Sequence, residues 1–271
     1  MARPLWLVEL LKKSFPQRFA VARLTRVPLV GRVLERWLFD GDDILYLPDD
    51  RVIPIRQSVE PPTQTVLPSR VVEHFIDQAT HHWVMNFCIC REGEHCREYP
   101  RNLGCLFLGE AVEGINPALG RRVSKAEAHA HVRQCREAGL VHLIGRNKLD
   151  SVWLGVGPKE KLLTICNCCP CCCLWRMLPN VATAIGDRVT RMPGVSVSVS
   201  ERCEGCGTCT QGTCFVDAIS LGGDRAEISD ACRGCGRCVK ACPNGAIDIS
   251  VDFERWIGLS IDRIARLVDL S

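Results

Sequence analysis

Apolar residues recur at the three- and four-residue spacing of amphipathic helices near both ends of the chain. One such stretch is residues 4–40, which Pro16 and Pro28 break into short helices, because proline lacks a backbone donor and clashes with the preceding turn. Residues 251–271 are predicted to form one amphipathic helix that covers the neighbouring domain or docks to a partner. Its apolar positions are Phe253, Trp256, Ile257, Ile261, Ile264, Leu267 and Val268.

The middle of the chain begins with a segment of low periodicity. Residues 41–69 are rich in proline and aspartate and are predicted to be a linker with room for one short hairpin. An apolar stripe then predicts a helix from Ser69 to about Asn86. This helix leads directly into the first group of cysteines.

A second helix is followed by short apolar runs. Ser124 and Glu127 form a capping box that starts this helix, which should end at Gly139. We predict residues 70–180 to be a cysteine-rich, mainly helical domain with a small β-hairpin or meander, the outline of a winged helix. Its tip, Arg146 and Lys148, could touch a phosphate backbone, but two basic residues on a turn are too few to predict DNA binding. The expected strands are residues 140–144, 152–156 and 161–165, with a turn at 145–148.

Period-two segments in the last third of the chain form an internal repeat. Strand-like residues 195–200 and 226–229 each precede a cysteine run, and residues 218–221 and 246–249 follow the two runs at the same relative place. Each repeat is therefore predicted to be strand, loop, short helical turn and strand. The predicted fold class is α+β, with a repeat domain at residues 190–250.

The composition of the chain limits the kinds of protein that it could be. A chain of 271 residues with 46% hydrophobic and 24% charged residues is globular and long enough for about two domains. The net charge of +3 does not by itself predict nucleic-acid binding. No uninterrupted apolar stretch reads as a secretory signal or a membrane span, and nineteen cysteines suit a reducing, oxygen-poor cytoplasm. We therefore expect a cytoplasmic protein of an anaerobe.

The N-terminal segment carries an unequal share of this charge. Residues 1–39 hold eight basic and two acidic residues, so residues 1–40 are predicted to be a basic amphipathic arm. Such an arm could lie on an anionic membrane surface. Packing against its own body or against a partner subunit is the favoured interpretation, because the arm has little hydrophobic continuity.

Two cysteine runs carry the strongest chemical signal. Each follows C-x2-C-x2-C with a fourth cysteine further on, a spacing in which three thiolates bind one cubane cluster and the fourth binds the other. Structural zinc sites use pairs rather than triples of this kind, and disulfide scaffolds belong to small secreted chains. The expected ligands are Cys203, Cys206, Cys209 and Cys242 for one [4Fe-4S] cluster, and Cys232, Cys235, Cys238 and Cys214 for the other.

These residues resemble the two-cluster bacterial ferredoxins over about residues 190–250. The second run ends in Cys242-Pro243, as in that family, whereas the first run has four residues before Cys214 and no proline after it. We expect the first loop to use the same kind of ligands despite this departure. What the resemblance implies is a βαβ repeat that binds two clusters and transfers electrons.

A third group of cysteines fits no standard spacing. Cys88, Cys90, Cys96 and Cys105 are separated by gaps of one, five and eight residues, which match neither a ferredoxin run nor the usual zinc pairs. A third iron–sulfur cluster, a zinc site and reduced buried cysteines all remain open. His95 could replace one thiol as a ligand.

The densest run is Cys166-Asn167-Cys168-Cys169-Pro170-Cys171-Cys172-Cys173. Adjacent thiolates repel one another unless a metal neutralises them, so one or two further iron–sulfur clusters are the favoured interpretation and a thiol–disulfide or sulfur-handling site is the alternative. Cys135 or the 88–105 group could complete the ligand set. The six cysteines of the run are Cys166, Cys168, Cys169, Cys171, Cys172 and Cys173.

Several strings together suggest a second resemblance. Cys88-Ile89-Cys90-Arg91, residues 120–128, residues 138–142 and the 166–173 run, followed by the two-cluster module, look like an uncharacterised family of multi-cluster 4Fe-4S proteins from anaerobic bacteria and archaea. The similarity covers about residues 70–250. It implies that the C-x-C-R and six-cysteine strings supply additional cluster ligands.

The leading functional hypothesis is an electron carrier, or electron-transfer subunit of an oxidoreductase, that serves a redox partner protein. No dinucleotide fingerprint, phosphate loop, nucleophile elbow or metalloprotease string occurs in the sequence. One alternative is a reductase whose substrate site is a cluster at residues 166–173. A redox-sensing DNA-binding protein is the other, and it has less support.

Overall fold

The computed structural model describes residues 3–53, 67–251 and 253–270, without the side chains of residues 253–255. Residues 54–66 of the predicted linker lie outside the described residues. The remainder of that linker supplies a strand, β1, to the central sheet. Within the described part, no helix is both long and apolar enough to cross a membrane.

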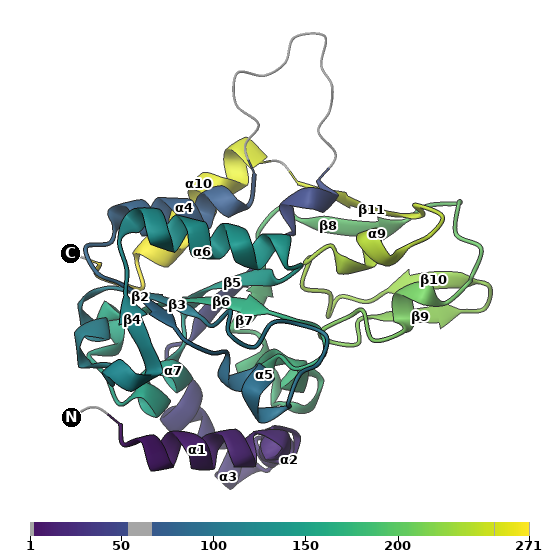
Figure 1. Cartoon of the computed structure of the whole chain (residues 1–271). Helices are drawn as coiled ribbons and strands as arrows, with labels where there is room; N and C mark the ends of the chain where they lie inside the picture. The colour runs from purple at the N-terminus through teal and green to yellow at the C-terminus, as the bar shows by residue number, and fades with distance from the viewer. Residues whose placement is uncertain (1–2, 54–66, 252, 271) are drawn as a thin grey trace.

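A seven-stranded mixed sheet forms the centre of the larger part of the molecule (Figure 1). The strand order is β4-β2-β3-β6-β5-β1-β7, and neighbours are antiparallel except for the parallel pair β1 and β7. The strands are β1 (Asp43–Tyr46), β2 (His82–Met85), β3 (Leu106–Leu108), β4 (Gly120–Arg122), β5 (Val141–Arg146), β6 (Leu163–Cys168) and β7 (Val189–Arg191).

Alternation along the strands sends side chains to two different cores. On β1, Leu45 joins a core beneath α4, α6 and α10, whereas Ile44 and Tyr46 join a core on the opposite face. The N-terminal helices and α7 lie on that opposite face (Figure 1). The helices are α1 (Leu5–Ser14), α2 (Arg18–Leu24), α3 (Pro28–Leu34), α4 (Ser69–Gln78), α5 (Ile89–Gly93), α6 (Lys125–Glu137), α7 (Lys148–Leu154), α8 (Thr183–Gly186), α9 (Arg237–Ala241) and α10 (Phe253–Ala265).

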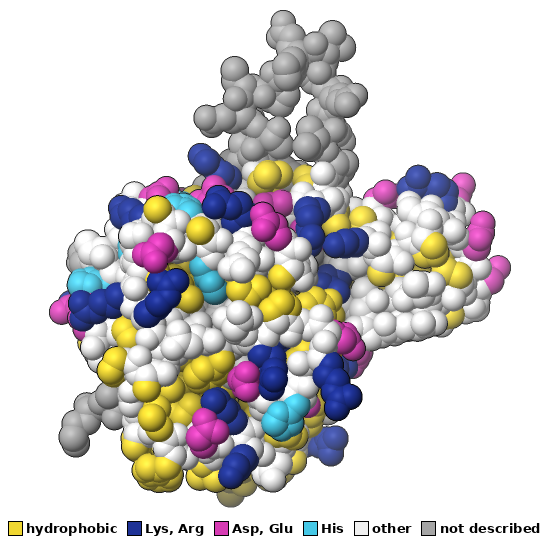
Figure 2. Space-filling view, viewed as in Figure 1, with side chains coloured by type: hydrophobic (Ala, Val, Ile, Leu, Met, Phe, Trp, Pro, Cys, Tyr) yellow, Lys and Arg dark blue, Asp and Glu magenta, His cyan; other side chains and the backbone are white. Residues whose placement is uncertain are grey.

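The N-terminal arm is helical and broken near Pro16 and Pro28, as its pattern predicts. It packs on the body through Val8 and Ala22, which are buried. Its outer side is apolar: of the twelve large hydrophobic side chains that are exposed in the described residues, ten lie between residues 5 and 37. Hydrophobic side chains gather at the lower edge of Figure 2, where α1 lies in Figure 1.

Three predictions for residues 70–180 are wrong. Residues 70–180 contribute five strands to the seven-stranded sheet instead of a small hairpin or meander. The helix from Ser69 ends at Gln78 because the aromatic and β-branched run of β2 pairs with β3 and β4. The predicted strand at 152–156 is α7 and the left-handed Gly155 that ends it. By contrast, the capping box at Ser124 and the helix end before Gly139 are confirmed.

The winged-helix outline is also wrong, since β5 and β6 are central strands joined by a helix. The two basic residues of its expected tip are engaged within the protein. Arg146 donates to the carbonyls of Gly41 (2.6 Å) and Leu267 (3.3 Å). Lys148 Nζ donates to the carbonyl of Arg36 (2.6 Å).

The C-terminal part projects from the sheet as two antiparallel pairs (Figure 1). In each half a strand leads into a cysteine loop, a short helix and a second strand. The last helix, α10, then returns to pack on α4, in the core beneath α4 and α6, and does not cover the cysteine loops. The strands are β8 (Ser196–Val199), paired with β11 (Ile247–Ser250), and β9 (Ile219–Gly222), paired with β10 (Arg225–Ile228).

Candidate iron–sulfur and metal centres

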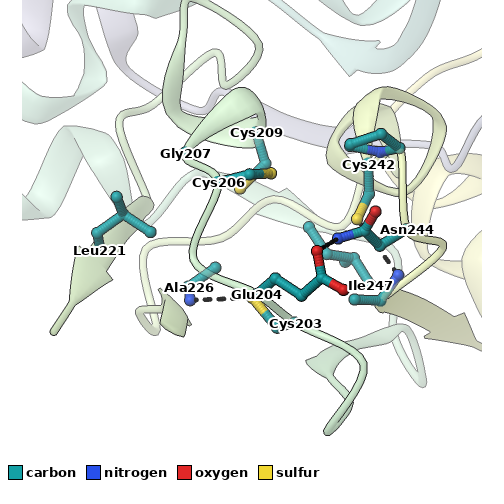
Figure 3. A pocket seen from close by; sticks show the side chains of 12 residues that line it. Cys203, Glu204, Cys206, Gly207, Cys209, Leu221, Ala226, Cys242, Asn244 and Ile247 are labelled. Carbon is teal, nitrogen blue, oxygen red and sulfur yellow. Dashed lines mark hydrogen bonds between the residues drawn. The ribbon is translucent and has the colours of Figure 1, made fainter. Parts of the chain in front are cut away.

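Four cysteines line a pocket at the surface, which we call the outer pocket (Figure 3). Backbone N–H groups point at two of the sulfurs: Ala226 donates to Cys203 Sγ (3.4 Å) and Ala246 donates to Cys242 Sγ (3.2 Å). A side-chain hydrogen bond from Asn244 to Glu204 (3.0 Å) crosses the rim. The four cysteines are Cys203, Cys206, Cys209 and Cys242.

A second pocket, the inner pocket, is lined by residues of the same C-terminal part, some of which pack in one core with β1 of the large sheet. Ala218 N–H donates to Cys214 Sγ (3.3 Å) and Gly234 N–H donates to Cys232 Sγ (3.4 Å). The loop is anchored to the body because Asp49 N–H donates to the carbonyl of Cys235 (3.1 Å). The cysteines lining this pocket are Cys214, Cys232, Cys235 and Cys238.

The two cysteine loops have nearly the same backbone. The glycines on either side of the second cysteine have φ of 64° and 74° in the first loop and 65° and 77° in the second. Asp217 (φ 51°) repeats the left-handed turn of Gly245 (φ 56°). The extra residue of the first loop is accommodated next to Gly212, at φ 65°.

The surroundings of the thiols differ between the pockets. Burial raises the pKa of Cys235 and Cys238 to about 12. Cys206 is exposed, and its hydrogen bond with Thr208 lowers its pKa. Buried thiols of this kind stay protonated unless a metal supplies positive charge, which deprotonates them on binding.

The six-cysteine run is divided between two sites. Cys166 and Cys168 lie on the same face of β6, and with Cys173 they line a cavity of about 430 Å³ under the N-terminal arm. Cys90 and Cys105, from the first group, complete its thiols, and Cys105 Sγ lies 3.9 Å from Cys166 Sγ. We call this space the thiol cavity; its other walls are largely apolar side chains of α1, α2 and the segment around Trp175.

The remaining three cysteines of the run meet Cys96 in what we call the four-thiol group. The sulfurs of Cys96, Cys169, Cys171 and Cys172 all lie within 4.8 Å of one another. Cys171 Sγ is 3.6 Å from Cys96 Sγ, 3.4 Å from Cys169 Sγ and 3.5 Å from Cys172 Sγ. A hydrogen bond from Cys171, against the effect of burial, lowers the pKa of Cys169 to about 5.

Arg91 of the C-x-C-R string lies beside both cysteine groups and is fully buried. It donates to the carbonyls of Asn167 (2.7 Å) and Leu103. Burial by itself would lower its pKa, but the neighbouring Cys88 and Cys169 thiolates raise it. Hydrogen bonding with Cys90 lowers the pKa of Cys88 to about 7. The guanidinium is therefore a fixed positive charge among thiols.

Tyr46 lies between the inner pocket and the thiol cavity, packed in the same core as Cys168, Cys173 and Cys235. It is fully buried, and its hydroxyl has no hydrogen-bond partner among the described residues. Burial, and the charges of these thiols, raise its pKa. Sequence reasoning gave no role to Tyr46, because nothing local distinguishes it from an ordinary strand residue.

Two residues considered as ligands stand apart from the metal-binding groups. The sulfur of Cys135 lies outside the four-thiol group and 3.7 Å from His131 Nε2. His95 is exposed and is not part of the group of ligand atoms around Cys96.

Comparison with known proteins identifies one family in this chain. Residues 227–248, which contain Cys232, Cys235, Cys238 and Cys242, match the 4Fe-4S binding domain family. No curated protein and no solved structure matches the chain. The chain therefore contains at least one 4Fe-4S cluster-binding motif, and the four-thiol group is a further place where a metal could bind.

Proposed function

We propose that this protein is a ferredoxin-type electron-transfer protein that carries two [4Fe-4S] clusters, and a third in the thiol cavity, and exchanges electrons with a redox enzyme. The observation that carries the proposal is the composition of the two pockets. Each is lined by three cysteines of one run and the last cysteine of the other, which is the ligand exchange of two-cluster ferredoxins.

The contacts around the sulfurs support the same proposal. Backbone N–H groups at 3.2–3.4 Å point at cysteines of both pockets, and such hydrogen bonds to sulfur stabilise a reduced cluster and tune its potential. The repeated left-handed residues hold the loops in the shape that presents these N–H groups.

The arrangement of the sites supports a linear route for electrons. The outer pocket reaches the surface at exposed Cys206, the inner pocket abuts the sheet, and Tyr46 separates it from the thiol cavity. A partner would exchange electrons at the Cys206 side. The thiol cavity, lined on one side by the arm, would be the other end of the route.

Anaerobic reconstitution with iron and sulfide counted per chain tests the proposal. Two clusters require about eight irons and a third raises the count to about twelve. Cys242→Ser and Cys203→Ser should alter the EPR signal of one reduced cluster, and Cys214→Ser and Cys232→Ser should alter that of the other. If Cys242→Ser instead changes the same signal as Cys232→Ser, the exchanged ligand sets are incorrect.

A second candidate function is favoured by the thiol cavity. A cavity of about 430 Å³ with largely apolar walls is large enough for a small substrate beside a cluster, so the protein could be a reductase. Steady-state oxidation of a reduced dye in the presence of substrate would support it. An electron carrier would instead give only stoichiometric oxidation.

A further inference from the structure

We infer that Cys96, Cys169, Cys171 and Cys172 bind a single tetrahedral metal ion, zinc or ferrous iron, rather than a further iron–sulfur cluster. The inference concerns a site separate from both ferredoxin-type pockets and does not depend on electron transfer. It rests on the spacing of the four sulfurs, on the charges around them and on the segments that they connect.

The sulfur separations suit one shared ion. Four thiolates at the usual Zn–S distance of about 2.3 Å stand about 3.8 Å apart at the corners of a tetrahedron. The separations of 3.4, 3.5 and 3.6 Å from Cys171 Sγ to the other three are close to this value. Small adjustments of side-chain torsion angles would therefore close the four sulfurs on one ion.

A cubane cluster needs a wider arrangement, because its iron–sulfide core stands between the thiolates. Among the described residues, the four-thiol group is the one set of three or more potential ligands whose atoms all lie within 4.8 Å of one another. The cysteines of the outer and inner pockets, where cubane clusters are proposed, do not form such a compact set. The cysteines that line the thiol cavity do not form such a compact set either.

The charges around the group also suit one divalent ion. Four thiolates and one divalent ion carry a net charge of −2, which must be offset in a buried site. The buried guanidinium of Arg91 lies beside Cys169 and brings a positive charge to the group. Arg176 Nη1 donates to the carbonyl of Cys171 (3.1 Å). Both arginines therefore lie where the excess negative charge would be.

The ligands come from two segments that the ion would tie together. Cys96 follows α5, and its N–H donates to the carbonyl of Arg91 (2.9 Å). The other three cysteines belong to the turn after β6, where Pro170 lies between Cys169 and Cys171. No regular backbone pairing joins these segments, so the metal would fix the turn that also carries Cys173 into the thiol cavity.

The test uses the full chain, purified anaerobically from cells supplied with zinc and iron. Zinc, iron and acid-labile sulfide are counted per chain for the wild type, Cys96→Ser and Cys171→Ser. Cys135→Ala is the matched control, because Cys135 packs in the same apolar cluster but its sulfur is not in the group. X-ray absorption at the zinc edge of the wild type needs no variant and remains informative if a variant does not fold.

The expected result is one zinc per chain with four sulfur neighbours at about 2.3 Å, lost in Cys96→Ser and Cys171→Ser and kept in Cys135→Ala. One iron lost without sulfide would also support the site and identify ferrous iron as its metal. Loss of about four irons together with sulfide would overturn the inference in favour of a cluster. Unchanged metal content in both serine variants would overturn it as well.

Discussion

Replacing Arg91 by methionine tests whether the C-x-C-R string acts through its arginine. Methionine fills a similar length but donates no hydrogen bond. The change leaves the buried carbonyls of Asn167 and Leu103 without their donor and removes the positive charge beside Cys169. Each hydrogen bond from a charged group contributes about 1.5–3 kcal/mol, so the expected loss of unfolding free energy is about 3–6 kcal/mol.

That loss is comparable to the whole stability of many domains, about 5–15 kcal/mol. The assay is urea unfolding of the anaerobically purified protein, followed by far-UV circular dichroism. Arg133→Met is the matched control, because Arg133 is exposed on α6, and it should change stability by no more than about 0.5 kcal/mol. Arg91→Lys keeps the charge but not the planar fork, so it should fall between the two.

The reasoning would be refuted by an Arg91→Met protein within about 1 kcal/mol of the control, the lower end of the cost of one unsatisfied buried group. It would also be refuted by equal losses for lysine and methionine. Equal losses would mean that the charge beside the thiols contributes nothing.

Three further predictions address other parts of the molecule. Tyr46→Phe removes a buried hydroxyl that has no hydrogen-bond partner among the described residues and packs in the same core as Cys168 and Cys173. A cluster bound in the thiol cavity would give that hydroxyl an acceptor, so its loss should make the cluster's potential more negative; identical redox titrations would argue against this role. Burial lowers the pKa of His142 from 6.5 to about 4. The unfolded chain therefore binds more protons than the folded protein, and the free energy of unfolding should fall by roughly 3 kcal/mol as the pH drops from about 6.5 to 4. In His142→Gln the urea midpoint should change much less over this pH range, and a change as steep as in the wild type would contradict the assignment. Trp6 and Trp37, exposed by 68% and 73% on a basic arm, test the membrane alternative, which the arm's packing on the body disfavours. Little flotation with anionic vesicles is expected, unchanged when both become alanine, and strong flotation that drops in the double variant would contradict this.

Local spacing was enough to find the iron–sulfur motif. The C-x2-C-x2-C run binds through one short loop, so its chemistry is encoded within a few residues, and the match at residues 227–248 agrees with it. The thiol cavity could not be found in this way. Cys90 and Cys105 reach Cys166 only because β3 pairs with β6 and α5 follows β2, and such pairings between distant segments leave no local pattern.

The wrong prediction of a strand at residues 152–156 also arose because contacts between distant segments leave no local pattern. The run Val152–Val156 has strand-like composition, yet α7 forms because Trp153 Nε1 donates to Asp150 (2.8 Å) and the left-handed Gly155 ends the helix. Contacts with other segments decide such a short element. Gly155 is a helix stop signal in the sequence, but the sequence alone does not show that a helix precedes it.

The division of the six-cysteine run follows from strand geometry. Successive side chains of a strand point to opposite faces, so Cys166 and Cys168 both face the arm, and Cys169 falls on the side of α6 beside Cys135. The chain then turns at Pro170, which lets Cys171 and Cys172 join Cys169 instead of continuing the alternation. Six thiols within eight residues therefore need not share one cofactor. Cys166 and Cys168 on the strand, with Cys173 after the turn, line a wide cavity suited to a cluster, whereas Cys169, Cys171 and Cys172 meet at the close spacing suited to a single ion.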